Sequence, residues 1–369
     1  MPTPRLNDVK EIRRIDKSDM LTFSVNAAKH CREAARIATQ ISLNYPKPDN
    51  IIIAGMGGSA IGGELLKDWA RSKVQIPIEV SRDYKLPAYA GPRSLVVIVS
   101  YSGDTEESLS AFLDAMQRKC MTFCLSSGGK LLEFAEKLRV PRLKVPSGIS
   151  PRAALPYLLV PMLMLLEKQG LAHKVSHELD ESARILETVA GQNAPDKPAK
   201  NNPAKTLAMG IAETVPIIYG FGILRGAAQR FKQQFNENAK TLAKWEVFPE
   251  LDHNEVVGWE KAGNLANHFS AIFLRDNDEP KEVRSRIEIT KALMQPAGSK
   301  QFEVRSQGNS DLAKMLSTIL VGDFASVYLA VLRGVDPTPV HTITLLKEKL
   351  NQTDTKARIL SELEKLSKA

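Results

Sequence analysis

Three hydroxyl side chains stand close together directly after an apolar stretch of the chain. They are Ser100, Ser102 and Thr105, and they stand at the end of, and just after, residues 94–101, which are nearly all Val, Ile and Leu. Gly103 lies among them, and a helix is expected to begin just afterwards. Neutral hydroxyls and the first N–H groups of a helix bind a phosphate dianion without a metal or a lysine. The simpler alternative is that these side chains only cap the helix.

A glycine-rich loop gives a second candidate for anion binding. Residues 51–63 read IIIAGMGGSAIGG, the pattern of a buried strand that breaks into a loop and opens a helix. Its glycines allow close backbone approach to a ligand, and Gly58 and Ser59 stand at the expected helix start. Serine replaces the lysine of a nucleotide-binding loop, which favours a sugar phosphate. A dinucleotide site stays open as an alternative, with Asp83 as the acidic ribose ligand.

Four charged side chains could do chemistry, and each has a simpler interpretation. Arg152 stands at an expected helix start, where a cation opposes the helix dipole, so an anionic partner is favoured. Glu237 lies in a helix three residues before Lys240 and could form a surface ion pair. His253 lies in a loop, and loops often carry function. Lys347 lies on an amphipathic, Lys-rich helix and by itself gives no reason to be catalytic.

Alternating strands and helices must position the two loops. Strands are expected at 50–55, 76–81, 94–101, 121–125 and 142–145. Helices are expected at 19–43, from the glycine loop to about 72, and at 106–118, 130–138 and 152–169. This alternation predicts an α/β fold, a doubly wound parallel sheet with helices on both faces. Both loops then follow the carboxyl ends of strands, where such sheets bind ligands.

The second half of the chain begins the same pattern again. Strands are expected at 215–220, 268–275 and 301–306, and helices from about 224 and at 282–294, 311–332 and 342–369. Strand–Gly–helix at 51 and again at 216 predicts two copies of one fold, of which the second lacks the hydroxyl loop. Residues 191–203, GQNAPDKPAKNNP, have the composition of a connector. We therefore predict domains at 1–190 and 204–369, joined by a linker at 191–203.

Composition restricts the class of protein. The chain has 369 residues, 43% of them hydrophobic and 25% charged, which is typical of a globular protein. Its net charge of +8 is spread along the chain, unlike the clustered charge of most nucleic-acid readers. We expect no membrane span, a cytoplasmic location, reduced core cysteines at positions 31, 120 and 124, and no metal or other cofactor.

The two loops together resemble the sugar isomerase (SIS) domain. GMGGSAIGG followed by SYSGDTEES carries this likeness. Other segments resemble the bifunctional phosphoglucose/phosphomannose isomerase family, which has two SIS domains. They are SPRAALPYL around Arg152, FNENAK at 235–240, FPELDHNEVVG at 248–258 and GVDPTPVHTITLLKEKL near the C-terminus. Their order and spacing over nearly the whole chain make the resemblance specific.

The resemblance implies roles for individual residues. Glu237 would be the base that moves a proton between C1 and C2, and Arg152 would stabilise the enediolate. His253 would help to open the sugar ring from the partner subunit of a homodimer, and Lys347 would assist at the ring oxygen. The phosphate would be bound by Gly58, Ser59, Ser100, Ser102 and Thr105. Two positions, Asp104 and Asp252, are Asp where the family often has Asn, and Asp104 is expected to point away from the phosphate.

The implied activity is the metal-independent interconversion of glucose 6-phosphate and mannose 6-phosphate with fructose 6-phosphate. The chemistry suits those side chains: a partly desolvated carboxylate transfers the proton, and a fixed arginine stabilises the charged intermediate. A phosphosugar-binding regulator without chemistry and an isomerase of another phosphosugar are the alternatives. A glucosamine-6-phosphate synthase is disfavoured because residues 1–3 offer no nucleophilic cysteine.

Overall fold

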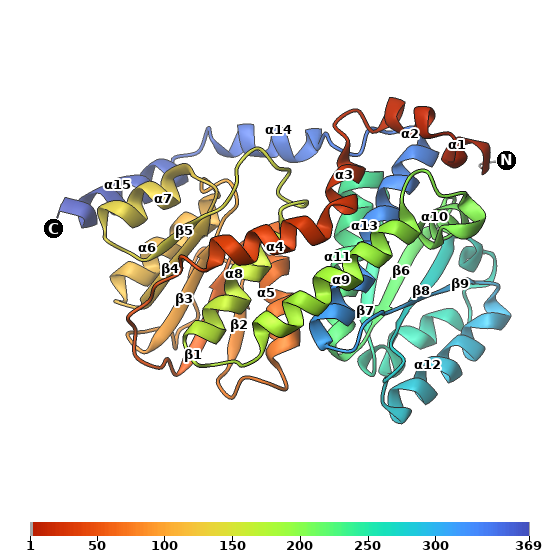
Figure 1. Cartoon of the computed structure of the whole chain (residues 1–369), viewed down its shortest axis with the longest axis horizontal. Coiled ribbons are helices and arrows are strands. Elements are labelled where there is room, and N and C mark those ends of the chain that lie inside the picture. The colour runs from red at the N-terminus through yellow and green to blue at the C-terminus, as the bar shows by residue number, and fades with distance from the viewer. Residues whose placement is uncertain (1–2, 369) are drawn as a thin grey trace. The chain divides into compact units, whose positions relative to one another are not determined.

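A computed structural model describes residues 3–368, which form two compact units (Figure 1). One unit comprises the chain up to Lys29 together with Glu178–Pro339. The other comprises His30–His177 together with the chain from Val340 onward. We name them by their sheets the four-stranded unit and the five-stranded unit. Their bounds differ from the predicted domains because each chain end packs with the sheet formed by the other half of the sequence.

The five-stranded unit is built on a parallel sheet in the order β2-β1-β3-β4-β5. Every strand expected in this half is present: β1 (Asn50–Ala54), β2 (Ile78–Ser81), β3 (Ser94–Val99), β4 (Met121–Ser126) and β5 (Arg142–Lys144). Strand β3 is buried along its whole length, as its continuous apolar sequence predicts, and β4 is buried along its whole length as well.

Helices cover both faces of this sheet (Figure 1). On one face α5 (Gly57–Ala70) packs on α8 (Leu155–Lys168), and on the other α6 (Glu106–Gln117) packs on α7 (Gly129–Lys137). The C-terminal helix α15 (Thr355–Lys368) lies against α6 and α7. Its Ile359 and Leu363 belong to the same buried cluster as Phe112 and Phe134. The end of the chain is therefore part of the core of this unit.

The four-stranded unit repeats the design. Its parallel sheet has the order β7-β6-β8-β9. The strands are β6 (Val215–Gly220), β7 (Lys244–Val247), β8 (Phe269–Arg275) and β9 (Lys300–Arg305). The longer helices are α9 (Val175–Asn193), α10 (Pro203–Ile211), α11 (Arg225–Ala239), α12 (Lys281–Met294) and α13 (Asp311–Arg333). The matching strand order confirms the prediction of an α/β fold with two copies of one pattern.

The long apolar helix expected at 311–332 is present as α13, and no membrane span was expected. By length and composition alone it could cross a membrane, but 89% of its most apolar window is buried within the fold. It packs on α10 and α11 of the same unit. This degree of burial inside the protein is typical of a core helix.

Several element predictions differ from the structure. Residues 19–43 form two helices, α3 (Met20–Val25) and α4 (Ala27–Ala38), separated at Asn26. The predicted connector 191–203 contains the end of α9 and a short 3-10 helix (Ala199–Asn201), and it belongs to the four-stranded unit. The C-terminal stretch is two helices, α14 (His341–Leu350) and α15. Strand β7 was missed because its four residues, KWEV, show no clear apolar alternation. Helix α9 was also missed, although its buried residues Val175, Leu179, Ala183, Leu186 and Ala190 recur at helical spacing.

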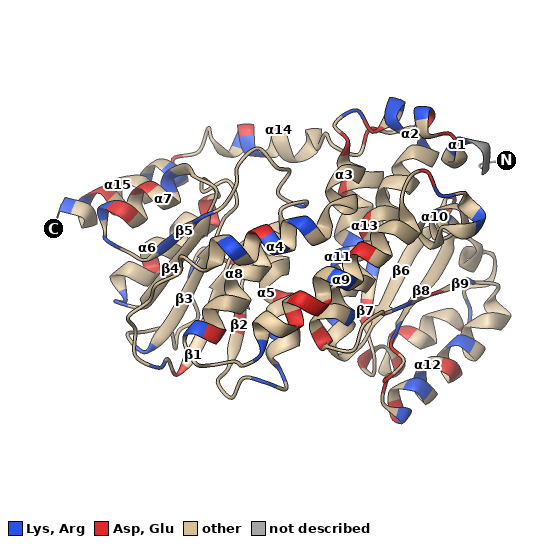
Figure 2. Ribbon diagram, in the orientation of Figure 1, with Lys and Arg blue, Asp and Glu red and all other residues tan. Residues whose placement is uncertain are grey.

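Charged side chains of both signs are interspersed over the helices of both units (Figure 2). The picture agrees with the spread of charge along the sequence.

Candidate active site

The strand order places the two predicted loops next to each other. In the order β2-β1-β3-β4-β5 the connections leave β1 and β3 in opposite directions along the sheet, so these neighbours form a switch point. Ligands of such sheets bind outside the carboxyl ends of the strands at this point. The glycine loop follows β1 and the hydroxyl loop follows β3. The topology therefore brings together two loops that are about 40 residues apart in the sequence.

The glycine loop turns directly into helix α5. The helix begins at Gly57, whose φ is +50°, a backbone conformation that residues other than glycine rarely adopt. Ser59 lies in the first turn with only 6% of its surface exposed. Its Oγ accepts a hydrogen bond from the backbone N–H of Tyr101 at 3.2 Å. This bond joins the glycine loop to the hydroxyl loop.

The hydroxyl loop is a tight turn held by its own side chains. The Oγ of Ser100 accepts the N–H of Gly103 at 3.1 Å and donates to the Oγ1 of Thr105 at 3.1 Å. A Cβ on Gly103 would lie 1.8 Å from the carbonyl oxygen of Gly128, so this position requires glycine. Thr105 is the N-cap residue of α6, as the capping alternative expects. In the described structure, however, its side chain makes no capping hydrogen bond.

Arg152 lies in a turn before α8, not in the helix, so its predicted place at a helix start was wrong. The backbone amides of Ala153 and Ala154 bond back to the carbonyl of Ser150, and α8 begins only at Leu155. Arg152 is 4% exposed, and its Nη1 donates to the Oγ of Ser150 at 2.9 Å. A buried guanidinium of this kind is held in one position, as an electrostatic catalyst requires.

The turn that carries Arg152 packs against the start of α5. A Cβ on Gly58 would lie 3.0 Å from the carbonyl oxygen of Pro151 and 3.5 Å from the Cα of Arg152. Five predicted phosphate-binding residues and Arg152 therefore share one end of the five-stranded unit. These residues are Gly58, Ser59, Ser100, Ser102, Thr105 and Arg152.

Two more predicted catalytic residues, Glu237 and His253, lie in the four-stranded unit. Glu237 is half-buried near the end of α11. This helix is fixed against α13 by buried polar pairs: Arg230 and Gln234 bond to Asp323, and Asn238 bonds to Ser326. The rotation of α11, and with it the direction of the Glu237 side chain, is therefore set by the core.

Lys240 was considered above as the partner of Glu237 in a surface ion pair, and in the structure its ammonium group binds backbone carbonyls. Its Nζ donates to four backbone carbonyl oxygens: those of Glu237 (2.8 Å), Asn238 (3.3 Å), Asp336 (3.0 Å) and Pro337 (2.8 Å). The first two carbonyls belong to the last turn of α11, where a cation is favourable. Lys240 thereby ties the helix end that carries Glu237 to the segment following α13.

His253 lies exposed on a short 3-10 helix, Glu250–His253. The loop around it is anchored by the buried side chains of Leu251 and Trp259. Asp252, one of the departures from the family pattern, accepts hydrogen bonds from Arg286 (3.0 Å) and Thr290 (2.9 Å) of α12. The histidine is therefore presented to solvent by a well-fixed loop.

The remaining predicted residues have clear places. Lys347 lies on α14, all of whose residues are exposed. Asp104 accepts the N–H of Lys130 at 3.4 Å and lies 3.9 Å from the Nζ of Lys356. Its carboxylate therefore contacts α7 and α15, in keeping with the expectation that it points away from the phosphate loop.

The equivalent switch point of the four-stranded unit cannot hold a phosphate in the same way. After β8, Arg275 is buried and ion-paired with Glu279, Glu288 and Glu303. Burial favours a higher pKa for Glu279, but hydrogen bonding and attraction from Arg275 outweigh it and lower that pKa below its ordinary value. The segment directly after β8 carries the carboxylates of Asp276, Asp278 and Glu279 where the segment after β3 carries hydroxyls, and carboxylates disfavour a phosphate. This agrees with the predicted loss of the loop from the second copy.

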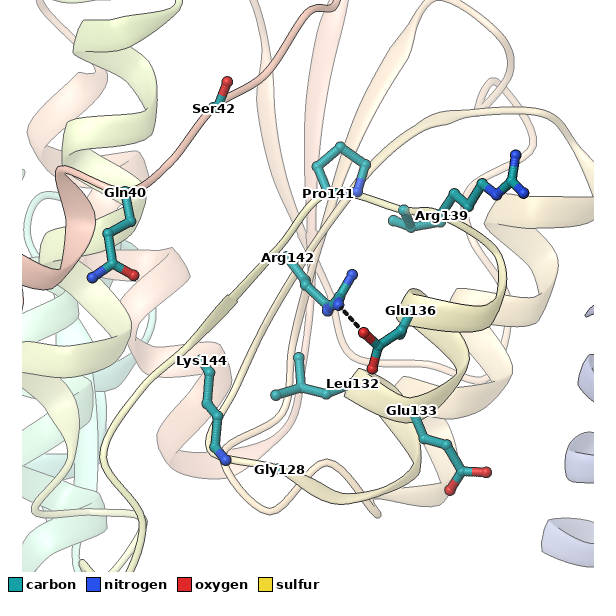
Figure 3. A pocket seen from close by; sticks show the side chains of 11 residues that line it. Gln40, Ser42, Gly128, Leu132, Glu133, Glu136, Arg139, Pro141, Arg142 and Lys144 are labelled. Atoms are coloured by element: carbon teal, nitrogen blue, oxygen red, sulfur yellow. Dashed lines mark hydrogen bonds and ion pairs between the residues drawn. The ribbon is translucent and has the colours of Figure 1, made fainter.

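A groove with a volume of about 910 Å³ lies elsewhere in the five-stranded unit, along the edge strand β5 (Figure 3). Its charged lining includes Arg139, Arg142 and Lys144 beside Glu133 and Glu136. The Nη2 of Arg142 pairs with Glu136 at 2.6 Å. None of the predicted site residues lines this groove, and it lies at the sheet edge instead of at the switch point. We therefore do not assign the chemistry to it.

Sequence reasoning missed Tyr101, although it stands between Ser100 and Ser102. Its side chain is buried, and its backbone carbonyl accepts bonds from Ser127 N (3.0 Å) and Ser127 Oγ (2.6 Å). The sequence feature that could have singled out Tyr101 is a large aromatic side chain within a loop of small polar residues.

Two parallel sheets of matching strand order, with loops bonded across a switch point, define an SIS-type phosphosugar isomerase fold. The sequence profile of the bacterial phospho-glucose isomerase C-terminal SIS domain matches residues 200–350. A glucose-6-phosphate isomerase structure from Chlamydia trachomatis has a TM-score of 0.67 at 14% identity, covering 92% of this chain and 77% of its own. The C-terminal domain of glucosamine-fructose-6-phosphate aminotransferase from Francisella tularensis has a TM-score of 0.65 at 16% identity, covering 87% and 98%.

Curated relatives identify the family. A bifunctional phosphoglucose/phosphomannose isomerase from Caldicellulosiruptor bescii is 42% identical over 88% of this chain and 97% of its own. The enzyme of that name from Aquifex aeolicus is 35% identical over 82% and 90%. A D-glucosamine-6-phosphate 4-epimerase from Sulfolobus acidocaldarius is 29% identical over 82% and 89%. The chain belongs to the bifunctional phosphoglucose/phosphomannose isomerase family, and it is an aldose–ketose isomerase of sugar phosphates.

Proposed function

We propose that this enzyme interconverts glucose 6-phosphate and mannose 6-phosphate with fructose 6-phosphate through an enediolate, without a metal or cofactor. The observation that carries the proposal is the joined pair of loops at the β1/β3 switch point, packed against the turn of the buried Arg152. This arrangement offers neutral donors for a phosphate and a fixed cation beside them.

The phosphate is bound by the hydroxyls of Ser59, Ser100, Ser102 and Thr105, by the backbone at Gly58 and by the first N–H groups of α5 and α6. The side chains carry no charge, so the two helix N-termini supply the positive potential. The phosphate serves as the handle that places C1 and C2 of the open-chain sugar within reach of the catalytic groups. Binding energy from this remote group is available to position the reacting carbons.

Glu237 acts as the base in the proposed reaction. Its carboxylate removes the proton from C2 of the open-chain aldose, the C–H electron pair forms the C1–C2 double bond, and the C1=O π pair moves onto O1 to give the enediolate. The hydroxyl proton of O2 passes to O1, and the same carboxyl group returns its proton to C1 as the C2=O bond of the ketose forms. Arg152 stabilises the negative charge on the oxygens of the intermediate. His253 and Lys347 assist proton transfer at the ring oxygen when the ring opens.

One site can serve both aldoses. Glucose 6-phosphate and mannose 6-phosphate differ only in configuration at C2, and this carbon is planar in the enediolate. Rotation about the C2–C3 bond presents either face of C2 to the same base. No additional catalytic residue is therefore required for the second sugar.

Glu237 belongs to the four-stranded unit, and Arg152 belongs to the five-stranded unit. We further propose that the enzyme is a cytoplasmic homodimer in which His253 completes the partner's site. Exposed apolar side chains near the His253 loop support this: Val257 (57% exposed), and Ile289 and Leu293 on α12 (60% each). The 3-10 helix of Val257 contacts α12, the helix that carries Ile289 and Leu293. Exposed apolar patches are typical of interfaces.

Subunit mixing tests the role of His253. The His253→Gln and Glu237→Gln homodimers are each expected to be inactive. In a mixed dimer one site combines the intact Glu237 of one chain with the intact His253 of the other. Random exchange of subunits should therefore restore about a quarter of wild-type activity. If exchanged mixtures stay inactive while native mass spectrometry shows mixed dimers, His253 does not act across subunits.

The overall activity is tested with fructose 6-phosphate as the only substrate and NMR detection of both aldose 6-phosphates. In deuterated water, proton abstraction predicts deuterium at C2 of the aldoses formed. Activity should survive EDTA. If the sugar binds but neither product nor deuterium exchange appears, the chain is a binding protein for the phosphosugar. D-glucosamine 6-phosphate should be assayed in parallel, because one relative is named for that substrate.

A further inference from the structure

Tyr101 connects three loops at the carboxyl edge of the five-stranded sheet. Its backbone N–H donates to Ser59 of the glycine loop at 3.2 Å. Its backbone carbonyl accepts bonds from Ser127, after β4. Its phenolic hydroxyl reaches a third segment, where it donates to the carbonyl of Pro146 and accepts the N–H of Ile149, each at 2.9 Å. Among the described residues 3–368, no other residue of the hydroxyl loop is hydrogen-bonded to this third segment.

The third segment leads directly to Arg152. Ile149 is bonded to the Tyr101 hydroxyl, and Ser150, the next residue, holds the guanidinium of Arg152 through its Oγ at 2.9 Å. The Ser150 carbonyl also begins the turn that precedes α8. Two hydrogen bonds of one phenol therefore close the segment 146–149 and fix the starting point of the Arg152 turn. Burial raises the pKa of the Tyr101 hydroxyl, so it stays protonated and able to donate at neutral pH.

We infer that Tyr101 is a positioning residue, which sets the distance between the phosphate-binding loop and the guanidinium of Arg152. This inference rests on the proposed function, because it takes Arg152 as the group that stabilises the enediolate. The backbone of Tyr101 holds the phosphate side of the site, and its hydroxyl holds the arginine side. The two roles can therefore be separated by removing the hydroxyl alone.

Tyr101→Phe is expected to lower kcat for fructose 6-phosphate isomerisation roughly 10- to 100-fold, because a small misplacement of a charged catalytic group is costly. The backbone bonds to Ser59 and Ser127 persist in the variant. KM for fructose 6-phosphate and the inhibition constant of inorganic phosphate should therefore change by less than about 3-fold. This split between kcat and phosphate affinity is what a merely structural role would not produce.

Tyr45→Phe is the matched control. The Tyr45 hydroxyl also donates to a backbone carbonyl, that of Thr122 at 3.0 Å, but Thr122 lies near the amino end of β4. Its loss should change the melting temperature about as much as Tyr101→Phe does and leave kcat close to wild type. If both variants lose kcat equally, the effect is general destabilisation and the inference is wrong.

A double-mutant cycle with Arg152→Lys tests whether Tyr101 acts through the arginine. In the Arg152→Lys background, Tyr101→Phe should lower kcat by less than about 3-fold. A full 10- to 100-fold loss in that background would overturn the inference while leaving the role of Arg152 intact. If Arg152→Lys itself keeps wild-type kcat, the proposed function fails at Arg152, and the role of Tyr101 falls with it.

Discussion

Replacement of Glu237 by glutamine is expected to lower kcat by roughly 10³-fold or more, since a positioned base contributes rate factors of this order. Glutamine keeps the shape of the side chain but cannot accept the C2 proton. KM for fructose 6-phosphate and inhibition by inorganic phosphate should stay close to wild type, because the phosphate loops belong to the other unit. Deuterium exchange at C2 in deuterated water should disappear together with turnover.

The structure indicates that this variant will fold. The bonds that fix α11 use Arg230, Gln234 and Asn238, and Lys240 binds the backbone carbonyl of Glu237. Glu282→Gln, on the exposed first turn of α12, is the control for removing a carboxylate from this unit. It should keep wild-type kcat. Wild-type-like turnover or exchange in Glu237→Gln would show that another group is the base.

Local patterns sufficed to predict the two loops, because their chemistry depends on residues that are close in sequence. The glycine loop needed positive φ and small side chains, and the hydroxyl loop is held by Ser100, Gly103 and Thr105 within one turn. The parallel α/β sheet was predicted from the alternation of strands and helices, whereas the order of its strands comes from the structure. Thus the phosphate side of the candidate site could be predicted before any coordinates were known.

Long-range contacts were the part that the sequence did not reveal. The sequence around Tyr101 does not indicate that its hydroxyl bonds to Pro146 and Ile149. These two residues lie in the segment that follows β5, and only the folded sheet brings that segment to Tyr101. Lys240 has the spacing of a helical ion pair with Glu237, yet its ammonium group binds carbonyls of a segment about 100 residues away. The sequence names the charged residue, but tertiary packing decides its partner.

The exchange of chain ends between units has the same cause. α15 has an ordinary amphipathic pattern, and its Ile359 and Leu363 could pack on any apolar surface. Only the folded chain shows that this surface is formed by α6 and α7 of the first sheet. Domain bounds placed at a polar connector assign every later residue to the second domain. They therefore cannot show that α15 packs in the unit formed by the first half of the sequence.

Arg152→Lys is expected to lower kcat by about 10²-fold, equivalent to about 2.7 kcal/mol of transition-state stabilisation. Lysine keeps the positive charge, but it lacks the planar fork that binds two oxygens at once. Its single ammonium group also cannot hold Ser150 and the substrate oxygens in the same geometry as the guanidinium, whose Nη1 bonds to Ser150 at 2.9 Å. Since phosphate is bound by other groups, KM for fructose 6-phosphate should change by less than about 3-fold.

An inhibitor that mimics the enediolate distinguishes this role from simple substrate binding. If Arg152 acts on the intermediate, Arg152→Lys should weaken a phosphorylated carboxylate analogue by about the same factor as kcat/KM, and inorganic phosphate hardly at all. Arg142→Lys, on the exposed edge strand β5, is the matched control and should leave all three constants unchanged. Equal losses for the analogue and for inorganic phosphate would instead place Arg152 at the phosphate, and the enediolate would need another source of positive charge.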